Sequence, residues 1–261
     1  MKSLTKHLTA IKESGKGLFV PYIMAGDHPN GLAGLEETLL KLEQSGVSTI
    51  EIGIPFSDPV ADGPVIQSAG IRALKKQTTL KEIITILQKS QVKIPLVIMS
   101  YFNPIYKYGV ENFIEALKET PVKGLIIPDL PYEHRDFIEP FLAKADISLI
   151  PLVSLATSRK RMKLLAEQGS GFVYGVAING VTGTDTKYSE GLFDHLAYLT
   201  EVSPIPVLAG FGVSTVAQAE KFNQVCDGVI VGSHIVQALN EGKQDELDQF
   251  IDAIVAINKS N

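Results

Sequence analysis

The chain has 261 residues, of which 45% are hydrophobic and 20% are charged, and its formal net charge is −5. This composition is typical of a globular protein, and the acidic balance argues against nucleic acid or an anionic membrane as the main partner. The acidic balance is still compatible with a small anionic substrate, because backbone N–H groups can bind phosphate without net positive charge. Cys226 is the single cysteine, so the chain has no internal disulfide framework.

The N-terminal segment predicts a short helix. Leu4, Leu8 and Ile11 fall on one helical stripe, which is typical of an amphipathic helix that packs on the main body. The segment lacks the apolar core of a signal peptide, and no apolar run in the chain approaches the length that crosses a bilayer. We therefore expect a cytoplasmic protein.

Short apolar, β-branched runs recur along the chain, and stretches with helical spacing separate them. Residues 35–42 and 80–87 carry apolar side chains at intervals of three and four, and Thr215 followed by Gln218 resembles a capping box at another helix start. The eight runs that we interpret as strands are 17–25, 48–54, 94–100, 123–128, 147–153, 171–177, 205–210 and 227–232.

Alternating strands and helices predict a parallel sheet with right-handed crossovers. An open doubly wound sheet and a closed barrel both fit that pattern, but eight units in about 250 residues favour the barrel. Because no linker or composition shift divides the sequence, we expect residues 1–261 to form one α/β domain, a (β/α)8 TIM barrel with an extra N-terminal helix.

The second predicted strand carries an acid inside an isoleucine run, at residues 50–54. Side chains alternate between the two faces of a strand, so Glu51 and Gly53 share the face opposite to the isoleucines. If that face lines the barrel interior, Glu51 lies near the functional mouth at the C-terminal ends of the strands, where burial raises a carboxyl pKa. A structural ion pair is the alternative, but the expected strands carry no Arg, and Lys123 lies at the opposite mouth.

The loop after this strand holds further carboxylates. Asp62 precedes Gly63-Pro64, and the motif alone favours helix capping and catalysis equally. Asp58 has the pattern of a turn former or a surface contact, and Asp129, after the fourth strand, is a weaker candidate for the site.

Glycine-containing loops after the last strands indicate phosphate binding. Residues 210–214 follow the seventh strand and Gly232-Ser233 follows the eighth, and each loop leads into a helix whose N–H groups can face an anion. Residues 180–184 begin a long polar segment after the sixth strand, which fits either a mobile lid or an ordinary loop.

Two kinds of aldolase chemistry are disfavoured by the residues present. A Schiff-base enzyme needs a lysine at a strand end, and the expected strands supply none there. A metal enzyme needs clustered ligands, whereas the histidines are scattered, so we predict no metal site; His28 and His234 are the two near the functional mouth.

Residues 51–64, with supporting motifs in order along essentially the whole chain, closely resemble the signature of the tryptophan synthase α subunit family. The resemblance implies a lyase of tryptophan biosynthesis, which cleaves indole-3-glycerol phosphate to indole and glyceraldehyde 3-phosphate by a retro-aldol reaction. It also implies that Glu51 protonates C3 of the indole and helps to deprotonate the glycerol hydroxyl, while Asp62 accepts the indole N–H bond.

The resemblance further assigns substrate-binding roles. In the family, the loop of Asp62 and the loop of Thr182-Gly183 close over the substrate, so Thr182 would help to position Asp62. The indole pocket would comprise Tyr22, Met99, Tyr174 and Phe211, and the phosphate would rest on Gly183, Gly212, Gly232 and Ser233. This chain departs from the family pattern at three places. Many members have Phe at the position of Tyr22 and a Ser-Arg pair at that of Ala177-Ile178, and several have Leu at the position of Met99.

A partner is implied as well. In the family a β subunit that carries pyridoxal phosphate receives the indole in an α2β2 tetramer, the α chain binds no cofactor, and Pro55, Asp58 and Pro59 match positions that contact the partner. Two alternatives stay open: another phosphosugar-binding barrel enzyme, such as an isomerase or a synthase, and a subunit that activates a partner without catalysis of its own.

Overall fold

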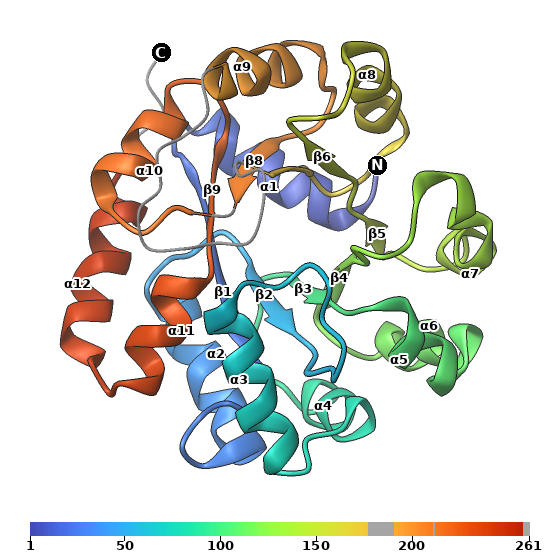
Figure 1. The fold of residues 1–261 in the computed structure, drawn as a ribbon, viewed down its shortest axis with the longest axis vertical. Coiled ribbons are helices and arrows are strands. Elements are labelled where there is room, and N and C mark those ends of the chain that lie inside the picture. Colours follow the sequence, from blue (N-terminus) through green and yellow to red (C-terminus); the bar gives the residue numbers. More distant parts are fainter. Residues whose placement is uncertain (177–190, 211, 258–261) are drawn as a thin grey trace.

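The computed structural model describes residues 1–176, 191–210 and 212–257 (Figure 1). In this part of the chain, nine parallel strands form one sheet with the order β5-β4-β3-β2-β1-β9-β8-β7-β6. The strands are β1 Leu18–Met24, β2 Ile50–Gly53, β3 Leu96–Met99, β4 Val122–Ile126, β5 Ser148–Leu149, β6 Leu152–Ser154, β7 Val173–Val176, β8 Val207–Gly210 and β9 Gly228–Val231.

The two edges of this sheet are consecutive pieces of one segment, which closes the barrel. β5 pairs with β4 and β6 pairs with β7, and two residues separate β5 from β6. The Ile150 N–H donates to the Leu125 carbonyl at 2.9 Å, and the Tyr174 N–H donates to the Pro151 carbonyl at 2.9 Å. The architecture is therefore the predicted (β/α)8 TIM barrel.

The strand count differs from the predicted eight because the expected strand 147–153 is interrupted. Pro151 has no N–H to give to a ladder, and the break falls between Leu149 and Leu152. The two short strands together occupy one position in the barrel, so the eightfold plan is kept.

Helices surround the strands in Figure 1. The predicted helical segments 35–42 and 80–87 lie in α2 and α4, and Thr215 with Gln218 forms the expected capping box at the start of α10. The helices and 3-10 turns are α1 Ser3–Glu13, η1 Gly31–Gly34, α2 Leu35–Gln44, α3 Pro64–Lys75, α4 Leu80–Leu87, α5 Phe102–Tyr108, α6 Val110–Lys118, η2 Tyr132–Phe137, α7 Glu139–Leu142, α8 Arg159–Gln168, α9 Leu192–Val202, α10 Val216–Asn223, α11 Ser233–Asn240 and α12 Gln244–Val255.

Apolar side chains form two separate cores. The outer core lies between strands and helices and includes Ile50, Ile52 and Ile54, as the alternation predicts. The inner core fills the barrel and includes residues from most strands: Leu18, Val20, Tyr22, Met24, Val97, Met99, Ile126, Ile150, Phe172, Tyr174, Leu208 and Ile230. Glu51 is the ionisable residue of β2, and its side chain projects toward this inner side.

The N-terminal helix α1 closes one end of the barrel. Leu4 and Leu8 are fully buried within the inner core, and Ile11 packs against it. A Cβ atom on Gly124 would lie 2.7 Å from the Leu4 side chain, so the glycine in β4 gives this helix room to approach. The predicted amphipathic helix is confirmed, and its apolar stripe serves as a plug.

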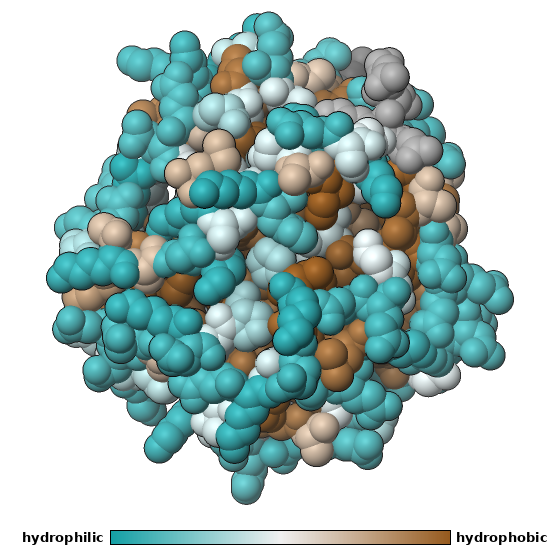
Figure 2. Space-filling view, turned by 180° about the vertical axis from the view of Figure 1, so that it is seen from behind, coloured by the Kyte–Doolittle hydropathy of each residue, from teal (hydrophilic) through white to brown (hydrophobic). Residues whose placement is uncertain are grey.

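No helix in the described ranges is long and apolar enough to cross a membrane. Figure 2 shows the face behind that of Figure 1, where hydrophilic side chains predominate and apolar ones appear in small separate areas.

Candidate active site

A cavity of about 490 Å³ lies at the C-terminal ends of the strands, opposite to the α1 plug. Its walls contain a buried acid pair, aromatic side chains and glycine-containing turns. Of the residues predicted from the sequence, the structure brings together Tyr22, Glu51, Asp62, Met99, Tyr174, Gly212, Gly232 and Ser233 around this space.

Glu51 projects from β2 into the barrel interior. It is 2% exposed, and its Oε2 atom has no hydrogen-bond partner in the described part of the chain. Burial, with a smaller contribution from the negative charge of Asp62, raises the pKa of Glu51 to about 8. A carboxyl group with that pKa is mainly protonated at neutral pH, so it can deliver a proton to a bound molecule.

Asp62 lies in the loop between β2 and α3 and does not cap the helix. The cap position of α3 is Gly63, without a side-chain cap bond, and Pro64 is the first helical residue. The Asp62 Oδ1 atom instead accepts a hydrogen bond from the Tyr101 hydroxyl at 3.0 Å. Of the two interpretations that the motif left equal, the structure removes capping.

The environment of Asp62 gives it a different protonation state from that of Glu51. Burial raises the pKa of Asp62 to about 6, and the hydrogen bond from Tyr101 partly opposes that rise. At neutral pH Asp62 is therefore mainly ionised, while Glu51 is mainly protonated. At this pH the protonated Glu51 can donate a proton, and the ionised Asp62 can accept a hydrogen bond.

Two tyrosines lie against glycines in the cavity wall. A Cβ atom on Gly53 would lie 1.9 Å from the Tyr22 hydroxyl oxygen, and one on Gly210 would lie 2.4 Å from the Tyr174 ring. Tyr22 therefore occupies the space that Gly53 leaves above Glu51. Met99 completes this aromatic and apolar part of the wall.

The opposite part of the wall consists of the turns predicted to hold phosphate. Gly212 has φ +91°, a conformation that favours glycine, and Ser233 is the first residue of α11. Gly212, Gly232 and Ser233 line the cavity, where helix N–H groups can face an anion. This placement agrees with the predicted phosphate site.

The predicted partner-contact residues differ in exposure. Asp58 is exposed, and its Oδ2 accepts a hydrogen bond from the Ser57 hydroxyl at 2.5 Å, which is the outward turn that we expected. Pro59 is partly exposed, whereas Pro55 is buried within the chain. Asp129 lies outside the cavity lining, and its Oδ1 accepts the Phe102 N–H at 2.8 Å at the start of α5, so its role is structural.

Several predicted residues lie outside the part of the chain that the structure describes. These are Thr182 and Gly183 of the 180–184 loop, Phe211, and Ala177-Ile178.

The sequence did not single out other residues of this cavity. Tyr101, which follows β3, holds Asp62, and a tyrosine directly after a barrel strand was the available signal. The remaining lining residues that sequence reasoning missed are Val65, Ile66, Ile230 and Gln237, whereas Val213 and Ser214 belong to the predicted 210–214 loop.

His234 lines the cavity, whereas His28 is not part of its lining. The imidazole of His234 packs against the Phe250 ring with centroids 4.3 Å apart, and the His28 Nδ1 accepts the Asn30 N–H. Within the described ranges, no group of three or more His, Cys, Asp and Glu side chains is arranged to hold a metal ion.

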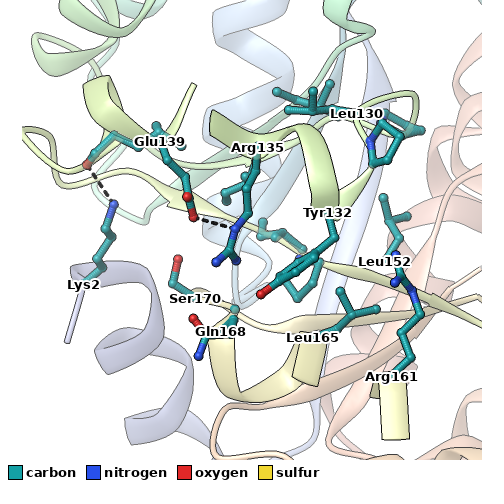
Figure 3. A pocket seen from close by; sticks show the side chains of 18 of the residues that line it. Lys2, Leu130, Tyr132, Arg135, Glu139, Leu152, Arg161, Leu165, Gln168 and Ser170 are labelled. Atoms are coloured by element: carbon teal, nitrogen blue, oxygen red, sulfur yellow. Dashed lines mark hydrogen bonds and ion pairs between the residues drawn. The ribbon is translucent and has the colours of Figure 1, made fainter. Parts of the chain in front are cut away.

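A second cavity of about 540 Å³ lies on the outside of the barrel, between η2, α7 and α8 (Figure 3). The charged residues of its lining all have partners: Arg135 pairs with Glu139 at 3.0 Å, Arg161 pairs with Glu133 beside the cavity, and the Lys2 ammonium donates to the Leu142 carbonyl at 3.0 Å. Both guanidinium groups also face the Tyr132 ring. This lining holds no buried acid pair of the kind found at the barrel mouth, so the cavity at the mouth is the better candidate for an active site.

Comparisons with known proteins agree with this geometry. A family model described as tryptophan synthase alpha chain matches residues 8–260. A tryptophan synthase alpha chain of Streptococcus mutans is 61% identical over 250 residues, 96% of each chain, and one of Streptococcus sanguinis is 58% identical over 99% of each chain.

Solved structures give the same result. A tryptophan synthase structure from Mycobacterium tuberculosis has a TM-score of 0.89 at 29% identity, covering 100% of this chain and 99% of the other. The alpha subunit of tryptophan synthase from Legionella pneumophila has a TM-score of 0.82 at 30% identity, covering 98% and 96%.

Proposed function

Because the chain belongs to the tryptophan synthase alpha chain family and is a lyase that cleaves indole-3-glycerol phosphate, we propose that Glu51 and Asp62 carry its acid–base chemistry. The observation that carries this proposal is the pair itself. A buried Glu51 carboxyl, with no partner for its Oε2 atom among the described residues, shares one cavity with an Asp62 carboxylate, and their pKa values of about 8 and about 6 lie on either side of neutral.

Glu51 starts the reaction as the acid. It gives its proton to C3 of the indole ring, which makes the ring an electron acceptor. The resulting Glu51 carboxylate then takes the proton of the glycerol hydroxyl, the carbon–carbon bond breaks, and its electrons return to the ring. The products are indole and glyceraldehyde 3-phosphate, and Glu51 is protonated again.

Asp62 acts through its charge. When C3 is protonated, positive charge develops on the ring, and an ionised carboxylate that accepts the indole N–H bond stabilises it. The bond from Tyr101 fixes the direction of the Asp62 carboxylate, so little reorganisation is needed as the charge appears.

The substrate fits the cavity in one orientation. The indole lies against Tyr22, Met99 and Tyr174, and the phosphate lies at Gly212, Gly232 and Ser233. We propose that Phe211 extends the indole pocket and that Thr182 and Gly183 complete the closed site. We further propose that this chain needs no cofactor, because the protonated indole ring itself accepts the electrons.

We also propose that a tryptophan synthase β subunit, which would carry pyridoxal phosphate, binds at the loops around this mouth and forms an α2β2 tetramer. Asp58, Pro59 and Val60, which is 82% exposed, lie in the loop after β2. After β3 and β4, exposed Tyr106 and Phe137 each contact the ring of Phe102. Exposed apolar side chains grouped in this way are typical of protein interfaces.

The direct test is indole release from indole-3-glycerol phosphate by the purified chain, with and without a β subunit. We expect Glu51→Gln and Asp62→Asn each to lower turnover, by roughly a hundredfold or more for the glutamate. Near-full turnover in both variants would remove the assigned roles. Activity of the chain alone would exclude an activating subunit without catalysis, and absence of indole under both conditions would favour another phosphosugar enzyme.

A further inference from the structure

Two polar side chains at the barrel mouth have no hydrogen-bond partner for one of their atoms among the residues that the structure describes. The Glu51 side chain is 2% exposed, and its Oε2 atom is unpaired. Tyr22 is 5% exposed, and its hydroxyl forms no hydrogen bond with the residues that the structure describes. One of these groups is a donor and the other an acceptor, so each offers what the other lacks.

Tyr22 and Glu51 are neighbours across the sheet. They are paired in register on the parallel strands β1 and β2, and both side chains line the same cavity. The Tyr22 hydroxyl lies directly over Gly53, where a Cβ atom would be 1.9 Å from its oxygen. A hydroxyl at Gly53 stands one inward-facing position above Glu51 on β2, on the side from which the substrate enters.

The groups that face Tyr22 keep its hydroxyl protonated. Burial raises the pKa of Tyr22 well above its usual value, and the carboxyl groups of Asp62 and Glu51 raise it further. Smaller contributions come from the Tyr101 and Tyr174 hydroxyls, and His234 of α11 lines the same cavity. A phenol in this setting donates a hydrogen bond and does not act as a base at working pH.

Building on the proposed function, we propose that the Tyr22 hydroxyl is a positioning donor, which gives a hydrogen bond to the Glu51 carboxylate once Glu51 has transferred its proton to the indole ring. An ionised carboxylate at this depth is costly without a donor, and no basic side chain among the described residues pairs with it. A phenol that is already buried beside Glu51 removes much of that cost.

Glu51 is the better acceptor than Asp62. The Asp62 Oδ1 atom already accepts a bond from the Tyr101 hydroxyl at 3.0 Å. Glu51 receives no bond from the described residues, and it is the group whose charge changes twice in each turnover. The need for a donor is therefore greatest at Glu51, and it is transient.

The test is Tyr22→Phe, which keeps the ring and removes the hydroxyl. The pH profile of kcat/KM for indole release should fall on the alkaline side as Glu51 loses its proton. Since a donor to the ionised form lowers the pKa of an acid, its removal should move that alkaline limb up by about one pH unit and lower kcat about tenfold. Tyr101→Phe, which removes the hydroxyl that donates to Asp62, should leave this alkaline limb in place.

A readout without substrate separates this proposal from the proposed function. The carboxyl band of Glu51, identified by its loss in Glu51→Gln, can be titrated by infrared spectroscopy in the folded chain, and Tyr22→Phe should raise its midpoint even if no indole were ever released. A change in KM with both pH limbs unmoved would overturn the proposal and leave Tyr22 a packing residue. A shift of the acid limb alone would overturn it too, because the partner of Tyr22 would then be Asp62.

Discussion

A buried carboxylate lies at each end of the barrel, and the two differ in their hydrogen-bond and ion-pair partners. At the end closed by α1, Asp227 is 0% exposed, pairs with Lys12 at 3.0 Å and accepts the Val207 N–H at 2.9 Å. At the open mouth, Glu51 is equally deep but has no basic partner within the described residues, and its Oε2 is unpaired. The first carboxylate serves stability, whereas the second keeps its bonding capacity for a ligand at a cost in stability.

The same contrast holds for the apolar residues. At the closed end Leu4 and Leu8 fill the barrel completely, and glycine in β4 admits them. At the open mouth, Gly53 and Gly210 make room for tyrosine rings that leave a cavity of about 490 Å³ beside them. Side chains fill the closed end of the barrel but leave a cavity at the open mouth, which is where a ligand has room to bind.

The largest expected effect on stability is at the plug. Leu8→Ala removes a fully buried side chain from the inner core and should lower the free energy of unfolding by about 3 to 4 kcal/mol. Urea unfolding measures it, and kcat of the remaining folded protein should be unchanged. A large loss of kcat at equal folded fraction would show that the two ends are coupled.

Glu51→Gln should raise the free energy of unfolding, by an amount that depends on pH. The unfolded chain releases the Glu51 proton near pH 4.5 and the folded chain near pH 8, so the wild type loses stability as pH rises through that window. Glutamine cannot ionise. The variant should therefore gain stability relative to wild type as pH rises from 5 to 8, by about 3 kcal/mol at pH 7, since each pH unit above 4.5 contributes about 1.4 kcal/mol. Parallel stability curves for the two proteins would contradict the raised pKa.

A smaller effect is expected from the ion pair at the closed end. Lys12→Met removes a cation that lies 3.0 Å from the buried Asp227 carboxylate, and because the lysine is 34% exposed we expect a loss of about 2 kcal/mol. The matched control is Lys41→Met, since Lys41 pairs with Asp248 at the same 3.0 Å on the surface. Thermal unfolding should show less than about 0.5 kcal/mol for the control. Equal losses would mean that burial of Asp227 adds nothing.

The sequence predicts much of the closed barrel and part of its mouth. Alternation in residues 50–54 places Glu51 inside, because strand periodicity is a local property. The bond between Tyr101 and Asp62 joins residues 39 positions apart and depends on how two loops meet, which no local pattern reports. Likewise, the stripe of Leu4 and Leu8 predicts a buried helix face but not which end of the barrel it closes.

The smallest effect is expected from Tyr101→Phe, which is also the most specific test of the open mouth of the barrel. The Tyr101 hydroxyl donates to Asp62 Oδ1 at 3.0 Å and accepts the Ala61 N–H at 2.9 Å, and its bond lowers the pKa of Asp62. Without it, that pKa should rise from about 6 by about one unit. Fewer molecules would then carry the ionised Asp62 in acid, so kcat/KM should fall about fivefold at pH 6 and hardly at all at pH 8. A loss of equal size at both pH values would instead mean that Tyr101 acts by holding the loop in place, and that the charge of Asp62 is set by burial alone.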